Sequence, residues 1–318
     1  MAAEEFRILI VDDVHPILMD RLSLLPQIVI DFQPQIPAEQ IAEAMRKANG
    51  LVIRTKTHIS GSMLAAAPKL RWVARAGAGL DNIDEAAAAA LDIQLFNAPE
   101  GNRDAVGEHV IGMLLSLFNK LTTAHAEVSK GIWQRETNRG IELMGKTVGL
   151  IGYGNNGRAT AKKLSGFGVK VLAYDKYLSG YGDQYTNEAG MERLFESCDI
   201  LSLHLPLTAE SRGLVDANYL GRFEKPIYLI NAARGELVKL ADLKTALDRG
   251  RVLGACLDVL ENEKLTSFHP AEKELHQALV NSGKVLFTPH VAGWTVESFR
   301  KISEVLARKI EAWFEATC

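Results

Sequence analysis

The sequence predicts an α/β protein with two units, each built around a doubly wound, mostly parallel sheet. Short apolar runs alternate with segments of helical periodicity, which is typical of parallel strands joined by crossover helices. This pattern restarts after a polar connection at residues 131–145. The length of 318 residues also exceeds the usual size of one domain. We therefore expect two α/β domains in one chain.

The first unit begins with apolar runs that fit strands buried on both faces. Helical segments at 38–48 and 84–90 separate some of them, and a long amphipathic helix is expected at 105–128. The predicted strands are 7–11, 28–32, 50–53, 72–74 and 93–96.

The second unit begins at Lys146 and shows the same alternation of apolar runs and helical segments. A helix is expected at 158–167, and the last helix of the chain at 296–314. The predicted strands are 148–151, 170–174, 200–203, 227–231, 252–257 and 284–287.

Composition excludes several classes of function. The formal net charge is −3 and no strongly basic block is present, so nucleic acid is not an expected partner. The longest apolar run, 110–118, is too short for a membrane span, and residues 1–5 do not resemble a signal peptide. Cys198, Cys256 and Cys318 are too few and too scattered for a disulfide framework or a metal site. We expect a soluble cytoplasmic protein without a metal.

Three glycines follow a predicted strand in the pattern that binds dinucleotides. Gly152, Gly154 and Gly157 form Gly-x-Gly-x-x-Gly directly after the strand at 148–151. The first glycine of such a loop allows a tight turn, the second lets the backbone approach a pyrophosphate, and the third lets helix and strand pack closely. By itself this pattern is equally typical of an ordinary glycine-rich turn.

An acidic residue at the end of the next strand strengthens the dinucleotide interpretation. Asp175 lies where a carboxylate hydrogen-bonds the ribose hydroxyls of the adenosine and repels a 2′-phosphate. Strand, glycines, helix and acid in this order predict a Rossmann domain that binds NAD rather than NADP. Lys176, the next residue, is the one feature that speaks against this preference.

Reactive side chains follow three later strands of the same unit. Arg234, Glu263 and His290 supply a cation for a carboxylate and carbonyl, a carboxylate to orient a histidine, and a proton donor. These are the parts needed to reduce a 2-keto acid. Arg234 could instead be a solvated turn residue, and Glu261 could take the place of Glu263 as partner of the histidine.

These segments together resemble the D-isomer-specific 2-hydroxyacid dehydrogenase family. The likeness extends from about Leu51 to Trp294 and includes Arg-Ala-Gly-Ala-Gly-Leu-Asp-Asn-Ile-Asp, the glycine loop, His-Leu-Pro-Leu-Thr, Asn-Ala-Ala-Arg-Gly and Thr-Pro-His. The family often has proline after the catalytic glutamate, but this chain has Lys264. That difference puts the local loop shape in doubt more than the chemistry.

The resemblance implies a role for each matching residue. Arg234 would bind the substrate carboxyl and carbonyl, His290 would act as the acid and base, and Glu263 would partner His290. Asp258 would hydrogen-bond the nicotinamide amide. Other residues would line the cofactor: Asn155, Asn156, His204, Pro206, Ala232 and Gly293. The backbone of a glycine-rich loop would grip the substrate carboxylate: Ala76, Gly77, Ala78 and Gly79.

The resemblance also implies an architecture. A Rossmann NAD-binding domain at 101–289 would be inserted into a flavodoxin-like substrate domain formed by 1–100 and 290–318. The active site would lie in a cleft that closes to exclude water. A homodimer is expected because the segment 105–128 carries more apolar surface than one domain would cover.

Two arginines bear on the substrate. Arg54 and Arg75 follow strand ends in the first unit, and within the family such arginines face a substrate phosphate. Because arginine offers a bidentate fork to phosphate, we expect a D-2-hydroxy acid such as 3-phosphoglycerate, with phosphohydroxypyruvate as its keto acid. Lys56 is expected to be solvated. Reduction of glyoxylate or hydroxypyruvate and oxidation of erythronate 4-phosphate remain alternatives.

Two other classes of function match parts of the sequence. Asp12 and Asp13 resemble the acidic pocket of a signalling receiver, but Arg54 follows the third strand, where a phosphoacceptor aspartate would be needed. A non-catalytic NAD-sensing scaffold on the same fold is a second alternative. The chain ends soon after its last helix, so no C-terminal regulatory domain is expected. The remaining histidines are expected to be solvated or structural: His58, His109, His125, His269 and His276.

Overall fold

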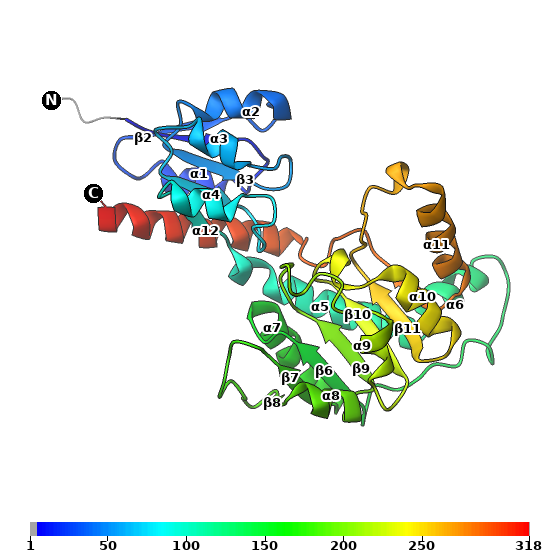
Figure 1. The fold of residues 1–318 in the computed structure, drawn as a ribbon. Helices are drawn as coiled ribbons and strands as arrows, with labels where there is room; N and C mark the ends of the chain where they lie inside the picture. Colours follow the sequence, from blue (N-terminus) through cyan, green and yellow to red (C-terminus); the bar gives the residue numbers. More distant parts are fainter. Residues whose placement is uncertain (1–4, 318) are drawn as a thin grey trace. The chain divides into compact units, whose positions relative to one another are not determined.

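The computed structural model describes residues 5–317, which form two compact units (Figure 1). One unit comprises Met1–Asn102 and Trp294–Cys318, and the other comprises Arg103–Gly293. Residues 290–293, expected in the first unit, therefore belong to the second. Cys318 and the first four residues lie outside the described part of the chain.

The first unit contains a parallel sheet whose order, over the described residues, is β2-β1-β3-β4-β5. This is the flavodoxin-like order. Side chains of β1 alternate between two cores, because Ile8 and Ile10 face one side of the sheet and Leu9 faces the other. The strands are β1 (Phe6–Ile10), β2 (Ile28–Phe32), β3 (Gly50–Ile53), β4 (Trp72–Arg75) and β5 (Gln94–Phe96).

Helices cover both faces of this sheet. The last helix, α12 (Val296–Thr317), buries Leu306 and Ile310 in the same core as Ile8 and Trp72, together with α1. The opposite face is covered by α2, α3 and α4. The bounds are α1 (Ile17–Leu22), α2 (Ala38–Met45), α3 (Gly61–Ala65) and α4 (Glu85–Ala90).

The second unit has a longer parallel sheet, ordered β12-β11-β10-β9-β6-β7-β8 among the residues described. The order reverses between β6 and β9, as in the Rossmann fold, where a dinucleotide binds at this switch point. The strands are β6 (Thr147–Ile151), β7 (Lys170–Tyr174), β8 (Asn187–Glu188), β9 (Ile200–Leu203), β10 (Ile227–Asn231), β11 (Val252–Leu257) and β12 (Val285–Phe287). The predicted fold class, two doubly wound α/β domains, is confirmed.

Two cores separate this sheet from its helices. Val110, Leu114 and Phe118 of α5 pack on one face with Val148 and Leu150 of β6. Residues from α8 to α11 pack on the other face. The helices are α5 (Pro99–Phe118), α6 (Leu121–Val128), α7 (Asn155–Leu164), η1 (Ser165–Phe167), α8 (Met191–Ser197), α9 (Ala217–Gly221), η2 (Gly235–Leu237), α10 (Leu240–Asp248), η3 (Leu265–Ser267) and α11 (Pro270–Asn281).

The single helix expected at 105–128 is wrong in detail. The segment forms two helices, and the break falls at Lys120, which adopts a left-handed backbone with φ of 51°. The first of the two helices, α5, also starts earlier, at Pro99, a residue well suited to a first helical turn. No helix within 5–317 combines the length and apolar character needed to cross a membrane.

Candidate active site

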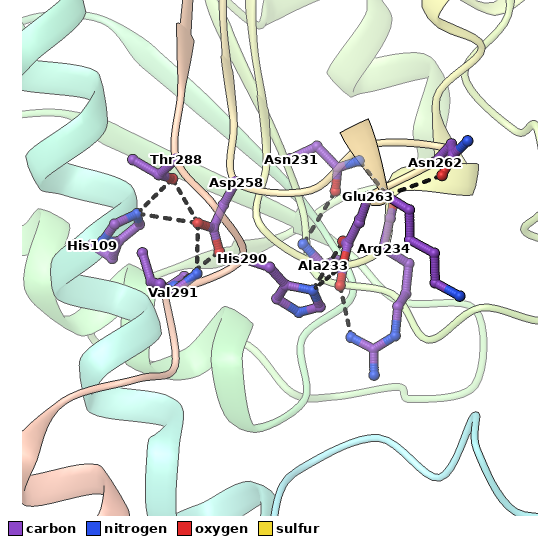
Figure 2. A network of polar contacts seen from close by, with 12 residues as sticks. His109, Asn231, Ala233, Arg234, Asp258, Asn262, Glu263, Thr288, His290 and Val291 are labelled. Atoms are coloured by element: carbon purple, nitrogen blue, oxygen red, sulfur yellow. Dashed lines mark hydrogen bonds and ion pairs between the residues drawn. The ribbon is translucent and has the colours of Figure 1, made fainter. Parts of the chain in front are cut away.

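The candidate catalytic residues lie beyond the carboxyl ends of three adjacent strands. Arg234 follows β10, Asp258 follows β11 and His290 follows β12. Because β12, β11 and β10 are neighbours in a parallel sheet, the three loops emerge side by side (Figure 2). The sheet order thus brings together residues separated by more than fifty positions in the chain.

His290 and Glu263 form a close pair. The Nδ1 atom of His290 lies 2.9 Å from each carboxylate oxygen of Glu263, and both side chains are 46% exposed. The backbone of His290 is left-handed, with φ of 56°, and its N–H donates to the carbonyl of Asp258 at 2.7 Å. A left-handed non-glycine residue is held against its own preference, so the surrounding loop fixes the direction of the imidazole.

The sequence left open whether Glu261 or Glu263 is the partner of His290, and the geometry distinguishes them. Glu261 accepts a hydrogen bond from the backbone N–H of Leu240 at the start of α10, at 2.9 Å. Glu263 is the residue against His290. In place of the proline common in the family, Lys264 donates its backbone N–H to Asn262 at 3.0 Å, and Asn262 donates to Glu272 at 3.2 Å. The loop therefore has its own polar support.

The loop that carries Arg234 is braced internally. The side chain of Asn231 accepts from the N–H of Ala233 at 3.1 Å and donates to the carbonyl of Arg234 at 2.8 Å. The guanidinium of Arg234 donates to the carbonyl of Ala233 at 2.7 Å (Figure 2). A Cβ on Gly235 would lie 1.9 Å from the Leu260 carbonyl oxygen, so only glycine allows this close approach. Arg234 is thus a half-buried, held side chain rather than a solvated one.

A buried network centred on Asp258 adjoins the pair of His290 and Glu263. Its Oδ1 accepts from the Thr288 hydroxyl at 2.6 Å and the Val291 N–H at 2.9 Å, and its Oδ2 accepts from the Ala292 N–H at 2.8 Å. The Nε2 atom of His109, on α5, lies 3.5 Å from Oδ1 and 3.0 Å from the Thr288 hydroxyl. Burial raises the pKa of Asp258, but hydrogen bonds from His109, Thr288 and the two N–H groups outweigh it and bring the pKa to about 2.

His109, expected to be solvated or structural, has a structural role in this network. It interrupts the apolar face of α5 between Val106 and Val110, and histidine is seldom buried without a polar partner. That interruption is the signal that could have pointed to a buried acceptor nearby. By contrast, His276 packs between the rings of Phe268 and Phe287.

The glycine loop has the geometry of a pyrophosphate cradle. Gly152 has φ of 92°, and a Cβ there would lie 2.4 Å from the carbonyl oxygen of His204. A Cβ on Gly157 would lie 2.2 Å from the Gly152 carbonyl oxygen, whereas one on Gly154 would meet no atom within 4 Å. The open side at Gly154 is what a phosphate needs. Helix α7 starts at Asn155, earlier than expected, so Asn155 and Asn156 form its first turn, where free N–H groups favour an anion.

Asp175 is tied to this loop. Its carboxylate accepts from the N–H of Tyr153 at 2.8 Å, of Tyr177 at 3.0 Å and of Leu178 at 3.1 Å. Burial raises the pKa of Asp175, but these hydrogen bonds lower it by more, so the net pKa is below the ordinary value and the carboxylate is anionic. Lys176, the one feature that argued against a preference for NAD over NADP, forms an ion pair with Glu210. Its positive charge is thereby compensated.

The other expected cofactor residues follow β9, β10 and the His290 loop. His204 lies 3.0 Å from the hydroxyl of Ser202 through Nε2, and burial lowers its pKa to about 4, so its ring is neutral. Pro206 accepts from the Ser211 hydroxyl at 2.7 Å. Ala232 is half-buried beside Asn231, and Gly293 ends the second unit.

In the first unit, Arg54 is held at the end of β3. The backbone N–H of Arg54 donates to the carboxylate of Asp12 at 2.5 Å, and the side-chain Nη1 donates to the backbone carbonyl of Asp13 at 3.3 Å. Its guanidinium carbon lies 4.1 Å from the centre of the Trp294 ring. Asp12 and Asp13, considered as a receiver pocket, therefore support Arg54.

Arg75 lies beneath the glycine-rich loop. A Cβ on Gly77 would be 1.7 Å from its Nη1 atom, so the guanidinium packs directly against the backbone of Gly77. Asn97 donates to the Ala78 carbonyl at 2.6 Å, and the Ala98 N–H donates to the Gly77 carbonyl at 2.8 Å. The loop is thus fixed on both sides.

Lys56 was expected to be solvated, but its ammonium group also bonds the backbone. Its ammonium donates to the carbonyl of Val11 at 2.6 Å, to that of Ile36 at 3.4 Å and to that of Pro34. These carbonyls follow β1 and β2, so the lysine joins three segments of the first unit. Over residues 5–317, no group of three or more histidine, cysteine or acidic side chains is placed to hold a metal ion.

Comparisons with known proteins show the family to which the chain belongs. The model of the D-isomer specific 2-hydroxyacid dehydrogenase NAD-binding domain matches residues 111–292. The chain is 34% identical over 293 residues to D-3-phosphoglycerate dehydrogenase of Mycobacterium bovis, covering 92% of this chain and 53% of that protein. It is 31% identical over 272 residues to hydroxypyruvate reductase of Thermotoga maritima, covering 86% of this chain and 87% of that protein.

A solved structure shows the same fold over the whole length. The crystal structure of a Thermus thermophilus protein superposes with a TM-score of 0.82 at 26% identity, covering 98% of this chain and 97% of the other. The chain spans about half the length of several curated relatives that it matches, D-3-phosphoglycerate dehydrogenases among them.

Proposed function

The chain belongs to the family of D-isomer-specific 2-hydroxyacid dehydrogenases, and from this premise we propose that it catalyses hydride transfer between NAD and C2 of a D-2-hydroxy acid. The observation that carries the proposal is the His290–Glu263 pair, with Nδ1 2.9 Å from both carboxylate oxygens. Arg234 lies on the loop after β10 and Asp258 directly after β11. These groups are those that proton transfer at a 2-hydroxyl requires.

The pair has a defined chemical task. Glu263 accepts a hydrogen bond from the Nδ1–H of His290, which leaves Nε2 to take the proton from the C2 hydroxyl or return it to the carbonyl oxygen. Because the positive charge of a protonated His290 would lie against a carboxylate, Glu263 stabilises that state. Arg234 binds the substrate carboxylate and polarises the C2 carbonyl.

The second unit has the features that suit NAD. The open position at Gly154 and the first turn of α7 would hold the pyrophosphate, and Asp175 would accept from the ribose hydroxyls. Asn155, Asn156, His204, Pro206, Ala232 and Gly293 would line the remainder of the site, and Asp258 would bind the nicotinamide amide. When bound, NAD supplies the acceptor for the hydride. We assign the second unit to the cofactor and the first to the substrate.

We propose 3-phosphoglycerate, with phosphohydroxypyruvate as its oxidised form, as the substrate. The support is the likeness to D-3-phosphoglycerate dehydrogenases and the held guanidinium of Arg54. The backbone of Ala76, Gly77, Ala78 and Gly79, braced by Arg75, would bind the carboxylate. Hydroxypyruvate is the second candidate, because the chain covers 87% of the Thermotoga maritima hydroxypyruvate reductase.

We further propose that the protein is a cytoplasmic homodimer. No residue of α6 is buried, and the exposed apolar residues there continue into the following segment. Such a contiguous surface is typical of a protein interface. It contains Leu121, Val128, Ile132 and Trp133. Light scattering of the purified protein would test this, and a monomeric mass would contradict it.

The activity is tested by following NADH oxidation with phosphohydroxypyruvate, hydroxypyruvate, glyoxylate and pyruvate in parallel. Replacement of His290 by Asn should lower kcat by about 10²–10⁴-fold, because the proton donor is lost. A preference for phosphohydroxypyruvate would support the phosphoglycerate assignment. Activity only with unphosphorylated acids would overturn that assignment, and no activity with any acid would favour an NAD-sensing scaffold.

A further inference from the structure

The guanidinium of Arg54 rests against a wall of aromatic rings within the first unit. Its carbon lies 4.1 Å from the centre of the Trp294 ring and 5.6 Å from that of Phe299. The Trp294 and Phe299 rings meet at 71° with centroids 5.4 Å apart. His15 also packs edge-on against Phe299, with ring centroids 5.7 Å apart. Trp294 therefore has a supported ring that faces a cation.

Only part of the guanidinium is used by the protein. Nη1 donates to the Asp13 carbonyl at 3.3 Å. Within the described part of the chain, Nε and Nη2 donate to no protein acceptor. The side chain is thus gripped through one face and one nitrogen, while two N–H-bearing nitrogens remain available. A fork of this kind matches the geometry of phosphate or carboxylate oxygens.

The partner of the cation is also informative. Trp294 is 47% exposed, although it follows the buried Ala292 and precedes α12. A tryptophan face attracts a guanidinium through its ring quadrupole, more strongly where water is partly excluded. Since a held side chain loses less conformational freedom when an anion binds, the ring should tighten binding of that anion.

We propose that Trp294 is a positioning residue that holds Arg54 for an anionic group at the far end of the substrate, and that it thereby sets the preference for phosphorylated over unphosphorylated 2-keto acids. This inference rests on the proposed function, in which Arg54 receives the phosphate. Trp294 acts through Arg54 and does not itself contact the reacting atoms.

The test compares Trp294→Leu, Arg54→Leu and the double variant, each assayed with phosphohydroxypyruvate and hydroxypyruvate. Trp294→Leu should raise KM for phosphohydroxypyruvate about three- to tenfold and leave its kcat unchanged. KM for hydroxypyruvate should not move. In the Arg54→Leu background, the tryptophan substitution should have no further effect.

Two additional variants separate positioning from folding. Trp294→Phe keeps a weaker aromatic face, so its KM for phosphohydroxypyruvate should be close to the wild-type value rather than raised as in Trp294→Leu. Phe32→Leu removes another exposed aromatic ring of the first unit and should change neither substrate's kinetics.

The outcomes distinguish this inference from the proposed function. Equal losses on both substrates, an unchanged KM for phosphohydroxypyruvate, or an additive effect in the Arg54→Leu background would overturn the role of Trp294 while leaving the dehydrogenase proposal intact. A wild type without preference for the phosphorylated acid would overturn the substrate assignment and this inference together.

Discussion

The half-exposed pair of His290 and Glu263 and the buried network around Asp258 are neighbours with opposite properties. In the pair, Nδ1 of His290 lies 2.9 Å from each carboxylate oxygen of Glu263, and each side chain is 46% exposed. Asp258 is buried and accepts from two backbone N–H groups and a hydroxyl. The pair is arranged for proton transfer, whereas the network holds the charge of Asp258 in one place.

The two regions are joined by the backbone. The N–H of His290 donates to the carbonyl of Asp258, and the Asp258 carboxylate holds the next two N–H groups, those of Val291 and Ala292. A fixed anion therefore sets the left-handed turn that aims the imidazole. This division predicts that changes in the network cost stability and, through Asp258, affinity for NAD, whereas changes in the pair cost rate.

The largest effect on stability is expected from Asp258→Asn. Asparagine keeps one acceptor but turns an NH₂ group toward the Ala292 N–H that Oδ2 accepted from, so this buried donor loses its partner. We expect the free energy of unfolding to fall by about 2–4 kcal/mol. Urea unfolding followed by circular dichroism would measure it. A loss below about 1 kcal/mol would contradict the structural role assigned to this carboxylate.

The same variant gives a test by pH. Because the folded-state pKa of Asp258 is about 2, below the ordinary value, its charge contributes stability above pH 4. That contribution is lost as pH falls through the folded pKa. The difference in unfolding free energy between wild type and Asp258→Asn should therefore be constant from pH 5 to 7 and narrow between about pH 4 and 2.

A smaller effect, on rate alone, is expected from Glu263→Gln. Glutamine can still hydrogen-bond Nδ1 but cannot stabilise a protonated imidazole by charge, so kcat should fall about 10–100-fold. Because the pair is half-exposed, the midpoint of thermal unfolding should not change. Glu261→Gln is the matched control, since Glu261 bonds the start of α10 instead. Equal rate losses in the two variants would contradict the assignment of Glu263.

Sequence reasoning reached the exposed pair more readily than the buried network. The strand pattern predicted both sheets, and reactive residues at strand ends indicated the loops that meet beyond β10, β11 and β12. Parallel topology makes that inference possible, because the carboxyl ends of adjacent strands share one edge. It could not choose between Glu261 and Glu263, since a shift of two residues within an irregular loop leaves no periodic signal.

Two residues make contacts distant in sequence that the sequence did not indicate, His109 in a structural role and Lys56, which was expected to be solvated. His109 reaches Thr288 from α5, and Lys56 reaches the carbonyls after β1 and β2. Nothing near either residue in the chain indicates these partners. The break at Lys120 was missed although Asn119, Thr122 and Thr123 near it are weak helix formers, because helix lies on both sides and a left-handed lysine carries no sequence signature.

The smallest expected effect concerns His109, which lies at the edge of the network. His109→Leu removes the contacts with Thr288 and Asp258 while Thr288 and two N–H groups still hold the carboxylate, so the free energy of unfolding should fall by only about 1 kcal/mol. His109→Gln places an amide nitrogen near the position of Nε2 and should recover most of this loss. Since the imidazole of His290 is aimed by the backbone bond to Asp258, kcat should change less than about threefold in both variants. A rate loss in His109→Leu as large as that in Glu263→Gln, with unchanged stability, would show that proton transfer also depends on the buried network, and the separation of the two regions would fail.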